Sequence, residues 1–521
     1  MWPFTSDPVD ENYIRAASPN ERRCIVREYL GFYRALIVGG IFEFAESVDT
    51  NSVFTYIHAL RQCIDRHPQL SVTISKVESE SPYYVFCPQL DLRKHIEILG
   101  HSDQNGESET IAIQRALPSI LDAKWPVSVP AWKIVVLPFS DRRCFIGFSF
   151  SHTIGDGVSG LAFNRTFLDA LQERHAMTDL MYTSTRKPFN QPFDTANNLT
   201  ISWSFLLKPL LGAYLPVCIA SLCGGVNSLL PGTWTGAPIF YDPETYRTGV
   251  EMLTVDANLV EDALKLCRMH CAKLTGLLHQ MIISALSDCL PEPHTIDSFS
   301  SGTVINMRRQ VNASNDDMGL FVSADFQTFA LQKTVSNQTS KGFSWDLATS
   351  ITERLAVKSQ QLHDQPIGLL RYLTSVHSWT LSKLGARREG SYELSNLVDF
   401  KPLGSVDRCS VTAMLFCQPA DVTGGPPLTF NVVSAIGGPL VIAVSWQIGA
   451  LGFGLERKET DFVKDKDRFR LRFAFSRNIV TPEASGNNGL FDEANQNEER
   501  NEFSGVDYFN DKRLIRKGGN I

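Results

Sequence analysis

The chain has 521 residues, of which 43% are hydrophobic and 20% are charged, and its formal net charge is −7. This length suits about two to four domains or two large lobes, and the apolar share supplies a sizeable core. A nucleic-acid-binding protein normally carries a basic surplus, so the acidic balance argues against that class of function.

The cysteines and the N-terminus indicate where the protein works. Eleven cysteines are scattered along the chain, and none stands in a Cys-x-x-Cys pair. This pattern favours buried thiols in a reducing compartment over a disulfide scaffold. The first residues have neither the basic region nor the apolar run of a signal peptide. The cytoplasm is therefore the expected compartment.

Helix and strand signals are mixed in the first half of the chain. Apolar residues recur at helical spacing over 51–67, and 70–74 is typical of a strand. The apolar runs 133–137 and 144–150 flank a polar turn, which predicts a hairpin. A further helix is expected over 160–173.

An uncharged run of 22 residues, 209–230, follows a polar, proline-bearing stretch and is long enough to span a bilayer. Pro216 and the pair Gly224-Gly225 interrupt it, so we interpret it as a buried or interfacial connector. Peripheral contact with an endoplasmic-reticulum or lipid-droplet membrane is the alternative that it leaves open.

The second half repeats the mixture of elements. The spacing predicts a helix over 260–290 and strands over 428–433 and 440–446. Charged residues and Asn become dense after Gly454, so we expect 455–521 to be largely disordered. Two mixed α/β lobes with a ligand site between them follow from this arrangement.

The segment Ser151-His-Thr-Ile-Gly-Asp-Gly157 directly follows the predicted strand 144–150. A neutral His152 can accept a proton at pH 7, and Asp156 could hold the loop or orient the ring. Gly155 and Gly157 permit positive φ and close packing. By its spacing alone, this motif is more typical of a structural histidine than of a catalytic one.

Other candidate residues are better explained by packing. Cys267, His270 and Cys271 offer no complete zinc ligand set, and His279 lies inside an apolar helix, as a core histidine would. The sequence also lacks a Gly-x-Ser-x-Gly elbow and a phosphate-binding Gly-Lys-Ser/Thr loop. We therefore predict no metal and no protein nucleophile.

The run from Phe148 to Phe163 resembles the active-site segment of the fungal alcohol acetyltransferase family, which is related to plant BAHD enzymes and to condensation domains of peptide synthetases. Weaker matches to the family follow in the same order over about residues 12–454. They are Asn20-Glu-Arg-Arg23, Tyr29-Leu-Gly-Phe-Tyr33, His67-Pro-Gln-Leu70, Leu274-Thr-Gly-Leu-Leu-His279, Leu394-Ser-Asn-Leu397 and Ser445-Trp-Gln-Ile-Gly449.

The resemblance implies an α/β (α+β) fold of two pseudo-symmetric chloramphenicol-acetyltransferase-like lobes, with the active site in a tunnel between them. The expected division is an N-terminal lobe over 1–192, an apolar crossover connector over 193–235, a C-terminal lobe over 236–454 and a polar tail over 455–521. We expect a monomer.

The resemblance also implies a function. His152 would be the general base that moves an acetyl or short acyl group from acetyl-CoA to a small hydroxylated secondary metabolite, with no acyl-enzyme. Asp156 and Gly157 would be structural, and Arg308 best matches the arginine that pairs with the aspartate. Ser149 and Asn306 are candidate oxyanion donors, while the residues that contact CoA stay unassigned.

Two alternatives remain. The same base would also serve an amine, so N-acetylation is open. A non-catalytic relative of the family is the other alternative, because members continue past the Ser-Trp-Gln strand into a closing helix, and this sequence shows no convincing apolar helix there.

Overall fold

The computed structural model describes residues 11–464 except 101–105, 174, 176, 208–228, 291–294, 333–343 and 454–455. The apolar run 209–230 therefore lies almost wholly outside the described residues. No helix in the described part is long and apolar enough to cross a membrane.

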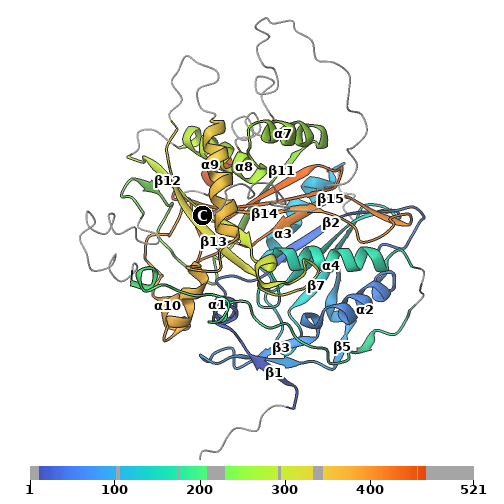
Figure 1. Cartoon of the computed structure of the whole chain (residues 1–521). Helices are drawn as coiled ribbons and strands as arrows, with labels where there is room; N and C mark the ends of the chain where they lie inside the picture. Colours follow the sequence, from blue (N-terminus) through green and yellow to red (C-terminus); the bar gives the residue numbers. More distant parts are fainter. Residues whose placement is uncertain are drawn as a thin grey trace, which may run out of the picture.

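The first half alternates short strands and helices (Figure 1). Its elements are β1 (Tyr13–Ala16), α1 (Pro19–Tyr29), β2 (Leu36–Phe44), η1 (Val53–Thr55), α2 (Ile57–Arg66), η2 (Pro68–Ser71), β3 (Val72–Ser75), β4 (Tyr83–Phe86), β5 (Gln89–Asp91), η3 (Leu92–His95), β6 (Ile96–Ile98), α3 (Glu109–Leu121), β7 (Trp132–Pro138), β8 (Arg143–Phe150), α4 (Gly157–Ala170) and β9 (Met181–Thr183). The predicted hairpin is confirmed, because β7 and β8 pair antiparallel.

The second half has longer strands and helices. Its elements are β10 (Thr233–Trp234), β11 (Thr248–Val255), α7 (Ala257–Met269), α8 (Leu274–Cys289), β12 (Ser298–Asn306), η4 (Arg308–Val311), β13 (Val322–Ala330), α9 (Trp345–Ser359), η5 (Pro366–Tyr372), α10 (Val376–Leu381), β14 (Tyr392–Phe400), β15 (Cys409–Cys417), β16 (Leu428–Ala435), β17 (Leu440–Gln447) and α11 (Glu456–Lys464). The strands predicted over 428–433 and 440–446 are confirmed as β16 and β17.

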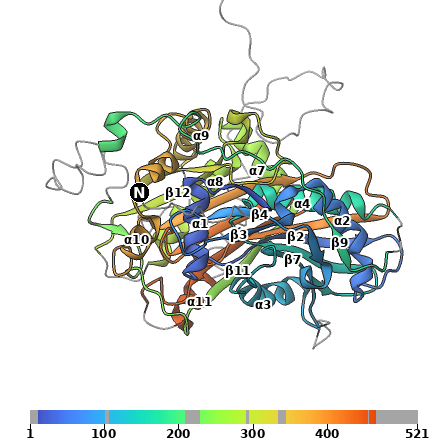
Figure 2. The ribbon, with the colours of Figure 1, turned by 90° about the horizontal axis from the view of Figure 1, so that it is seen from below.

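One sheet has the strand order β15-β2-β8-β7-β6. Successive residues of β2 point to opposite faces, so Leu36 and Val38 join the core beneath α2 and α4, while Ile37 packs toward α3. The core around α3 also takes in Val250 of β11 and Val441 of β17. Figure 2 shows α3 beside β11, so this helix lies between the two halves.

The other large sheet has the order β10-β12-β14-β16-β17-β11, with β13 paired to β12. Helices α7, α8 and α9 cover one face, where Leu278 and Ile282 join the same core as Phe430 and Ile442. This gives the second lobe its own core.

Strand β15 lies far along the sequence, yet it belongs to the sheet of the first half. It pairs antiparallel with β2, from Cys409 opposite Phe44 to Cys417 opposite Ile37. In Figure 1 the orange β15 runs beside the blue β2. The expected boundary of 236–454 for the second lobe is therefore wrong at β15, because pairing in a sheet does not depend on sequence order.

Two further predictions need correction. The helix expected over 260–290 is two helices, because α7 ends at Met269 and the backbone of Cys271 is left-handed, with a φ of 53°. The tail does not begin at 455, because α11 follows β17. Glu459 accepts hydrogen bonds from the backbone N–H groups of Gly449 (2.7 Å) and Leu451 (2.9 Å). Residues 465–521 lie outside the described part.

We predict that Glu459→Ala lowers the free energy of unfolding by roughly 1–3 kcal/mol, because the buried backbone N–H of Leu451 and the partly buried N–H of Gly449 would lose their acceptor. Urea unfolding measures this change, and Asp461→Ala on the exposed face of α11 is the control. A loss below about 0.5 kcal/mol would show that α11 does not close the lobe.

Candidate active site

The predicted motif forms the loop between β8 and α4. Strand β8 ends at Phe150, and Asp156 is the N-cap of α4, with its side chain accepting from the backbone N–H of Ser159 at 2.9 Å. The Ser159 hydroxyl in turn accepts from the Asp156 N–H at 3.1 Å, which completes a capping box. His152 therefore lies in a loop that is fixed at both ends.

Asp156 and Arg308 are in contact across the two halves of the chain. Arg308 Nη1 donates to Asp156 Oδ2 at 2.8 Å, and Arg308 Nη2 donates to Oδ1 at 2.9 Å. Both side chains are 1% exposed, so Arg308 is not a solvated surface charge. The bidentate geometry is the strong form of this interaction.

The Asp156 carboxylate has no capacity left for His152. Besides Arg308 and Ser159, it accepts from the backbone N–H of Phe321 at 3.0 Å. A carboxylate offers about four acceptor positions, and these donors fill them. Burial alone would raise the pKa of Asp156, but Arg308 and the hydrogen bonds hold it below its usual range. Asp156 thus holds the loop and does not orient the imidazole ring.

Arg308 also ties down the loop that follows η4. Its guanidinium donates to the backbone carbonyl of Asp317 at 3.0 Å and lies over the Phe321 ring, 4.7 Å from the centroid. The backbone N–H of Asp156 donates to the carbonyl of Gly319 at 3.1 Å. The ion pair is therefore the centre of a network that joins α4 to the second half.

Gly157 is required by close approach and not by an unusual backbone. Neither Gly155 nor Gly157 has a positive φ. A Cβ on Gly157 would lie 2.6 Å from Leu397 Cδ2 on β14, and one on Gly155 would lie 2.7 Å from Ser159 Cβ. The expectation of positive φ is wrong, whereas the expectation of close packing is confirmed.

The His152 ring is held neutral by its surroundings. Burial, followed by the charges of Arg27 and Arg23, lowers its pKa to about 4, while Asp156 and the histidine's own backbone act in the opposite direction. The ring centroid lies 5.5 Å from that of Tyr33. Nδ1 is enclosed and has no hydrogen-bond partner on any other described residue.

Helix α1 supplies several of the groups around His152. Arg23 and Arg27 lie four residues apart, hence on one face of the helix. Arg27 donates to Asp421 at 2.7 Å and lies 4.7 Å from the Tyr33 ring centroid. Glu28 accepts a hydrogen bond from the Ser151 hydroxyl, and burial raises its pKa to about 7.

The second half contributes a polar network that ends at Tyr33. The Tyr33 hydroxyl donates to Gln418 Oε1 at 2.8 Å. The Gln418 amide nitrogen then donates to Glu393 at 3.1 Å and to Asn431 at 3.0 Å. Burial raises the pKa of Glu393.

Several ionisable groups in this region share two properties. Burial is the largest cause of each pKa shift, yet each residue keeps intermediate solvent accessibility. Each of these side chains is therefore largely enclosed but keeps some contact with solvent. These groups are Arg23, Glu28, His152 and Glu393.

None of these neighbours of His152 was predicted from the sequence. Asn20-Glu-Arg-Arg23 and Tyr33 were noted in the sequence only as matches to the family, although they include residues that lie near His152. Two arginines four residues apart on one helix repel each other and destabilise the helix. Such a pair on a half-buried helix therefore indicates a functional role for the two charges. Gln418 and Glu393 reach the site only through the fold.

The two candidate oxyanion donors have different surroundings. Ser149 is fully buried on β8, and its hydroxyl has no partner among the described residues. Asn306 is exposed, and its side chain is engaged with Asn315 at 3.1 Å and with the backbone N–H of Arg308 at 3.1 Å. Asn306 therefore supports the Arg308 loop.

The histidine and cysteine candidates outside the motif are placed apart from it. His279 is fully buried and bonds Tyr392 at 2.8 Å and Thr303 at 2.9 Å, as expected of a core histidine. Cys267 is buried, whereas Cys271 is exposed beyond the end of α7. The group of possible metal ligands found within the described residues is a different one, formed by His58, Glu173 and His175.

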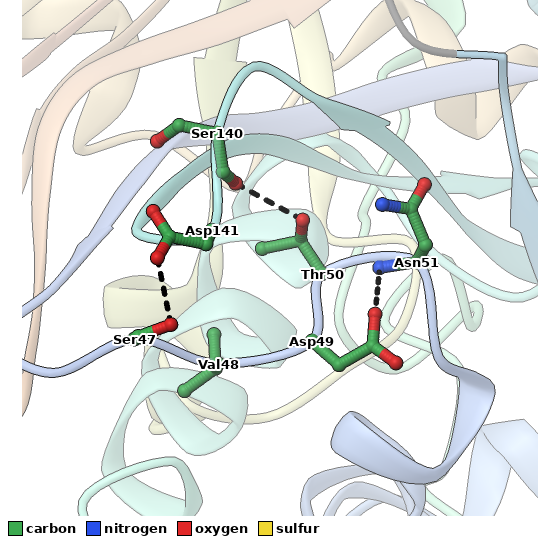
Figure 3. A pocket seen from close by; sticks show the side chains of 7 residues that line it. All are labelled: Ser47, Val48, Asp49, Thr50, Asn51, Ser140 and Asp141. Atoms are coloured by element: carbon green, nitrogen blue, oxygen red, sulfur yellow. Dashed lines mark hydrogen bonds between the residues drawn. The ribbon is translucent and has the colours of Figure 1, made fainter.

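A surface hollow of about 390 Å³ lies at the turn between β7 and β8 (Figure 3). Its polar groups bond one another, as in Ser47 to Asp141 at 2.7 Å and Thr50 to the Ser140 carbonyl at 3.0 Å. It lies at the opposite end of β8 from His152, about 25 Å away for a strand of this length. It is not part of the candidate site.

Breaking the Asp156–Arg308 pair from either side should destabilise the protein by about 3–5 kcal/mol, because one buried charge loses its partner. The variants are Asp156→Asn and Arg308→Met, and the double variant should cost less than the sum of the two. Urea unfolding measures the three free energies. Lys265→Met, which breaks an exposed pair with Glu261, is the control with an expected loss below about 1 kcal/mol. Losses of that small size at Asp156 would contradict the structural role.

A Glu28→Gln variant should gain stability relative to the native chain as pH rises. The raised pKa means that the folded state holds the Glu28 proton more tightly than the unfolded state, so stability from this group is lost as pH rises from about 4.5 to 7. The neutral amide has no such loss. Melting temperatures of both proteins at pH 5 and pH 8 test this. A difference in melting temperature between Glu28→Gln and the native chain that is the same at both pH values would contradict it.

The chain is similar in sequence to known fungal proteins. A model of the alcohol acetyltransferase family (AATase) matches residues 21–452. A probable alcohol acetyltransferase of Fusarium pseudograminearum, FCK4, is 22% identical over 487 residues, which cover 87% of this chain and 93% of the relative. A probable alcohol acetyltransferase of Aspergillus fumigatus, crmB, is 22% identical over 396 residues, with coverages of 72% and 81%.

Solved structures share the fold. The trichothecene 15-O-acetyltransferase TRI3 of Fusarium sporotrichioides superposes with a TM-score of 0.61 at 14% identity, over 90% of this chain and 99% of that one. The first condensation domain of the CDA synthetase gives 0.57 at 11% identity, over 89% and 96%. The two-lobed α/β fold that the resemblance implied is thus confirmed. Because the family match covers most of its length, the chain belongs to the alcohol acetyltransferase family.

Proposed function

We propose that this acyltransferase moves an acetyl group from acetyl-CoA to the hydroxyl of a small molecule, with His152 as the general base. The observation that carries the proposal is the position of His152, which lies half-buried in the loop that the Asp156–Arg308 pair fixes to the second half of the chain. An imidazole that is uncharged at neutral pH has a lone pair ready to take a proton.

The ring nitrogens have different tasks in this proposal. We assign the proton to Nδ1, which is enclosed and therefore out of reach of a substrate. Nε2 is then the base. It takes the hydroxyl proton while the oxygen attacks the thioester carbonyl carbon.

The reaction balances without a protein nucleophile. The attack forms a tetrahedral adduct whose oxygen carries a negative charge and needs hydrogen-bond donors. The Ser149 hydroxyl is enclosed in the structure, so it is not accessible to this oxygen. Collapse of the adduct breaks the C–S bond, and the CoA sulfur takes the proton from the imidazolium. The products are an acetyl ester and free CoA.

The surroundings of His152 also argue against the two alternatives, N-acetylation and a non-catalytic relative. An amine acceptor would arrive protonated at neutral pH, and the arginine charges near His152 oppose its binding. A non-catalytic relative would not need a half-buried imidazole of this kind, and α11 follows the Ser-Trp-Gln strand as a closing helix would. O-acetylation is therefore the reaction that the site favours.

Replacing His152 by Ala should lower turnover by about 10²–10⁴-fold, the usual contribution of a general base. Release of CoA thiol from acetyl-CoA across a panel of alcohols measures this, and His175→Ala, at an exposed histidine, is the control. Because the lowered pKa leaves the base form present above about pH 4, kcat/KM of the native chain should stay constant from pH 8 to 6 and fall only toward pH 4. Unchanged turnover in the His152→Ala variant would end this proposal.

A further inference from the structure

Arg23 lies on the same face of α1 as Arg27 and has no carboxylate partner among the described residues. Its Nε and Nη2 atoms donate to Asn20 Oδ1, at 3.2 and 3.1 Å. Within the part of the chain that the structure describes, it forms no ion pair, and Nη1 makes no hydrogen bond. Nη1 is also absent from the enclosed polar atoms that lack a partner, so it is accessible to a bound molecule.

The neighbouring Arg27, in contrast, has a carboxylate partner. Arg27 bonds Asp421 at 2.7 Å and stacks over Tyr33. Asp421 and Glu393 act on Arg23 only at longer range, and burial together with Arg27 outweighs them, so the pKa of Arg23 is lowered. The charge of Arg27 is therefore neutralised by a carboxylate, whereas the charge of Arg23 is not.

The unbalanced charge lies one helical turn from groups that surround His152. Arg23 precedes Arg27 by four residues on α1, and Arg27 lies over the Tyr33 ring, whose centroid is 5.5 Å from that of His152. Arg23 is also among the causes that lower the pKa of His152.

The other charged groups in this region have partners. Asp156 has Arg308, and Arg27 has Asp421. Glu28 accepts from Ser151, and Glu393 accepts from Gln418. Among the described groups, Arg23 is thus the cation that a substrate would meet.

A largely enclosed charge without a partner is unfavourable, so its presence beside the candidate site indicates that a ligand supplies the counter-charge. A guanidinium edge matches the two oxygens of a carboxylate. The phosphates of CoA are poorly placed for this role, because the pantetheine arm separates them from the thioester that reacts at His152. The counter-charge then belongs to the acceptor.

We propose that the acceptor is an alcohol that also carries a carboxylate, and that this carboxylate binds the free Nη1 edge of Arg23 while the hydroxyl lies at His152. The inference rests on the proposed O-acetyl transfer and names its substrate class. Binding has a second effect, since a carboxylate that neutralises Arg23 raises the pKa of His152 and makes it a stronger base when the substrate is present.

The test compares hydroxy acids with their methyl esters, which keep the hydroxyl and lose the charge. The full chain should acetylate the acids with a kcat/KM at least about tenfold above that of the esters. Arg23→Gln should remove this preference through the KM of the acid, with the KM of acetyl-CoA unchanged, and Arg23→Lys should keep part of it. Melting temperatures confirm that each variant is folded.

Three outcomes would overturn the proposal. The esters could be used as well as the acids by the native chain. Arg23→Gln could lower kcat equally for acids and esters, which would assign Arg23 to the transition-state oxyanion. It could also raise only the KM of acetyl-CoA, which would assign it to the donor.

A second measurement does not depend on turnover, so it separates this inference from the proposed function. Trifluoroacetate serves as the carboxylate probe, because it stays ionised near pH 4, where the His152 ring titrates, and NMR follows that titration. Trifluoroacetate should raise the pKa of His152 in the native chain and leave it unchanged in Arg23→Gln. The same response in both proteins, or none in the native chain, would contradict a carboxylate site at Arg23 even if every acceptor failed to react.

Discussion

The buried ion pair between Asp156 and Arg308 joins residues 152 positions apart, and the geometry of the site depends on it. Asp156 caps α4 on one side and accepts from Arg308 and Phe321 on the other, so a single carboxylate fixes the loop of His152 to the second lobe. A buried pair is costly to form and costlier to break, which makes its contribution one of position more than of net stability. In the proposed mechanism, the His-x-x-x-Asp spacing places the base and the residue that anchors it at the two ends of one short loop.

Electrostatics then decide what His152 can do. The carboxylate nearest in sequence is fully used by Arg308, whereas α1 brings two arginines toward the ring, and their charges together with burial keep it neutral. A neutral imidazole suits a base and does not suit a group that must remain charged. The arrangement differs from a hydrolase triad, in which the carboxylate orients the ring and the histidine activates a protein nucleophile.

Much of the local structure could be predicted from the sequence, because it depends on local patterns. The β7–β8 hairpin, α4 and the strands β16 and β17 follow from periodicity and turn residues. Strand β15 could not be placed, because it pairs with β2, which lies far away in the sequence, and local patterns carry no information on such pairing. The break at Cys271 is a backbone conformation that apolar spacing does not reveal, and α11 is polar overall, being held by Glu459 and a few apolar contacts. In the site, the order of motifs pointed to His152, but Arg23, Glu28 and Glu393 reach it through folding.

The central claim is that the anchored, neutral His152 acts as a base and never as an acyl carrier. Intact-protein mass spectrometry after incubation with acetyl-CoA, in the absence of any acceptor, tests this most directly. We expect the native chain to keep its unmodified mass. A stoichiometric gain of one acetyl group that maps to His152, and that is lost when an acceptor alcohol is added, would contradict the claim.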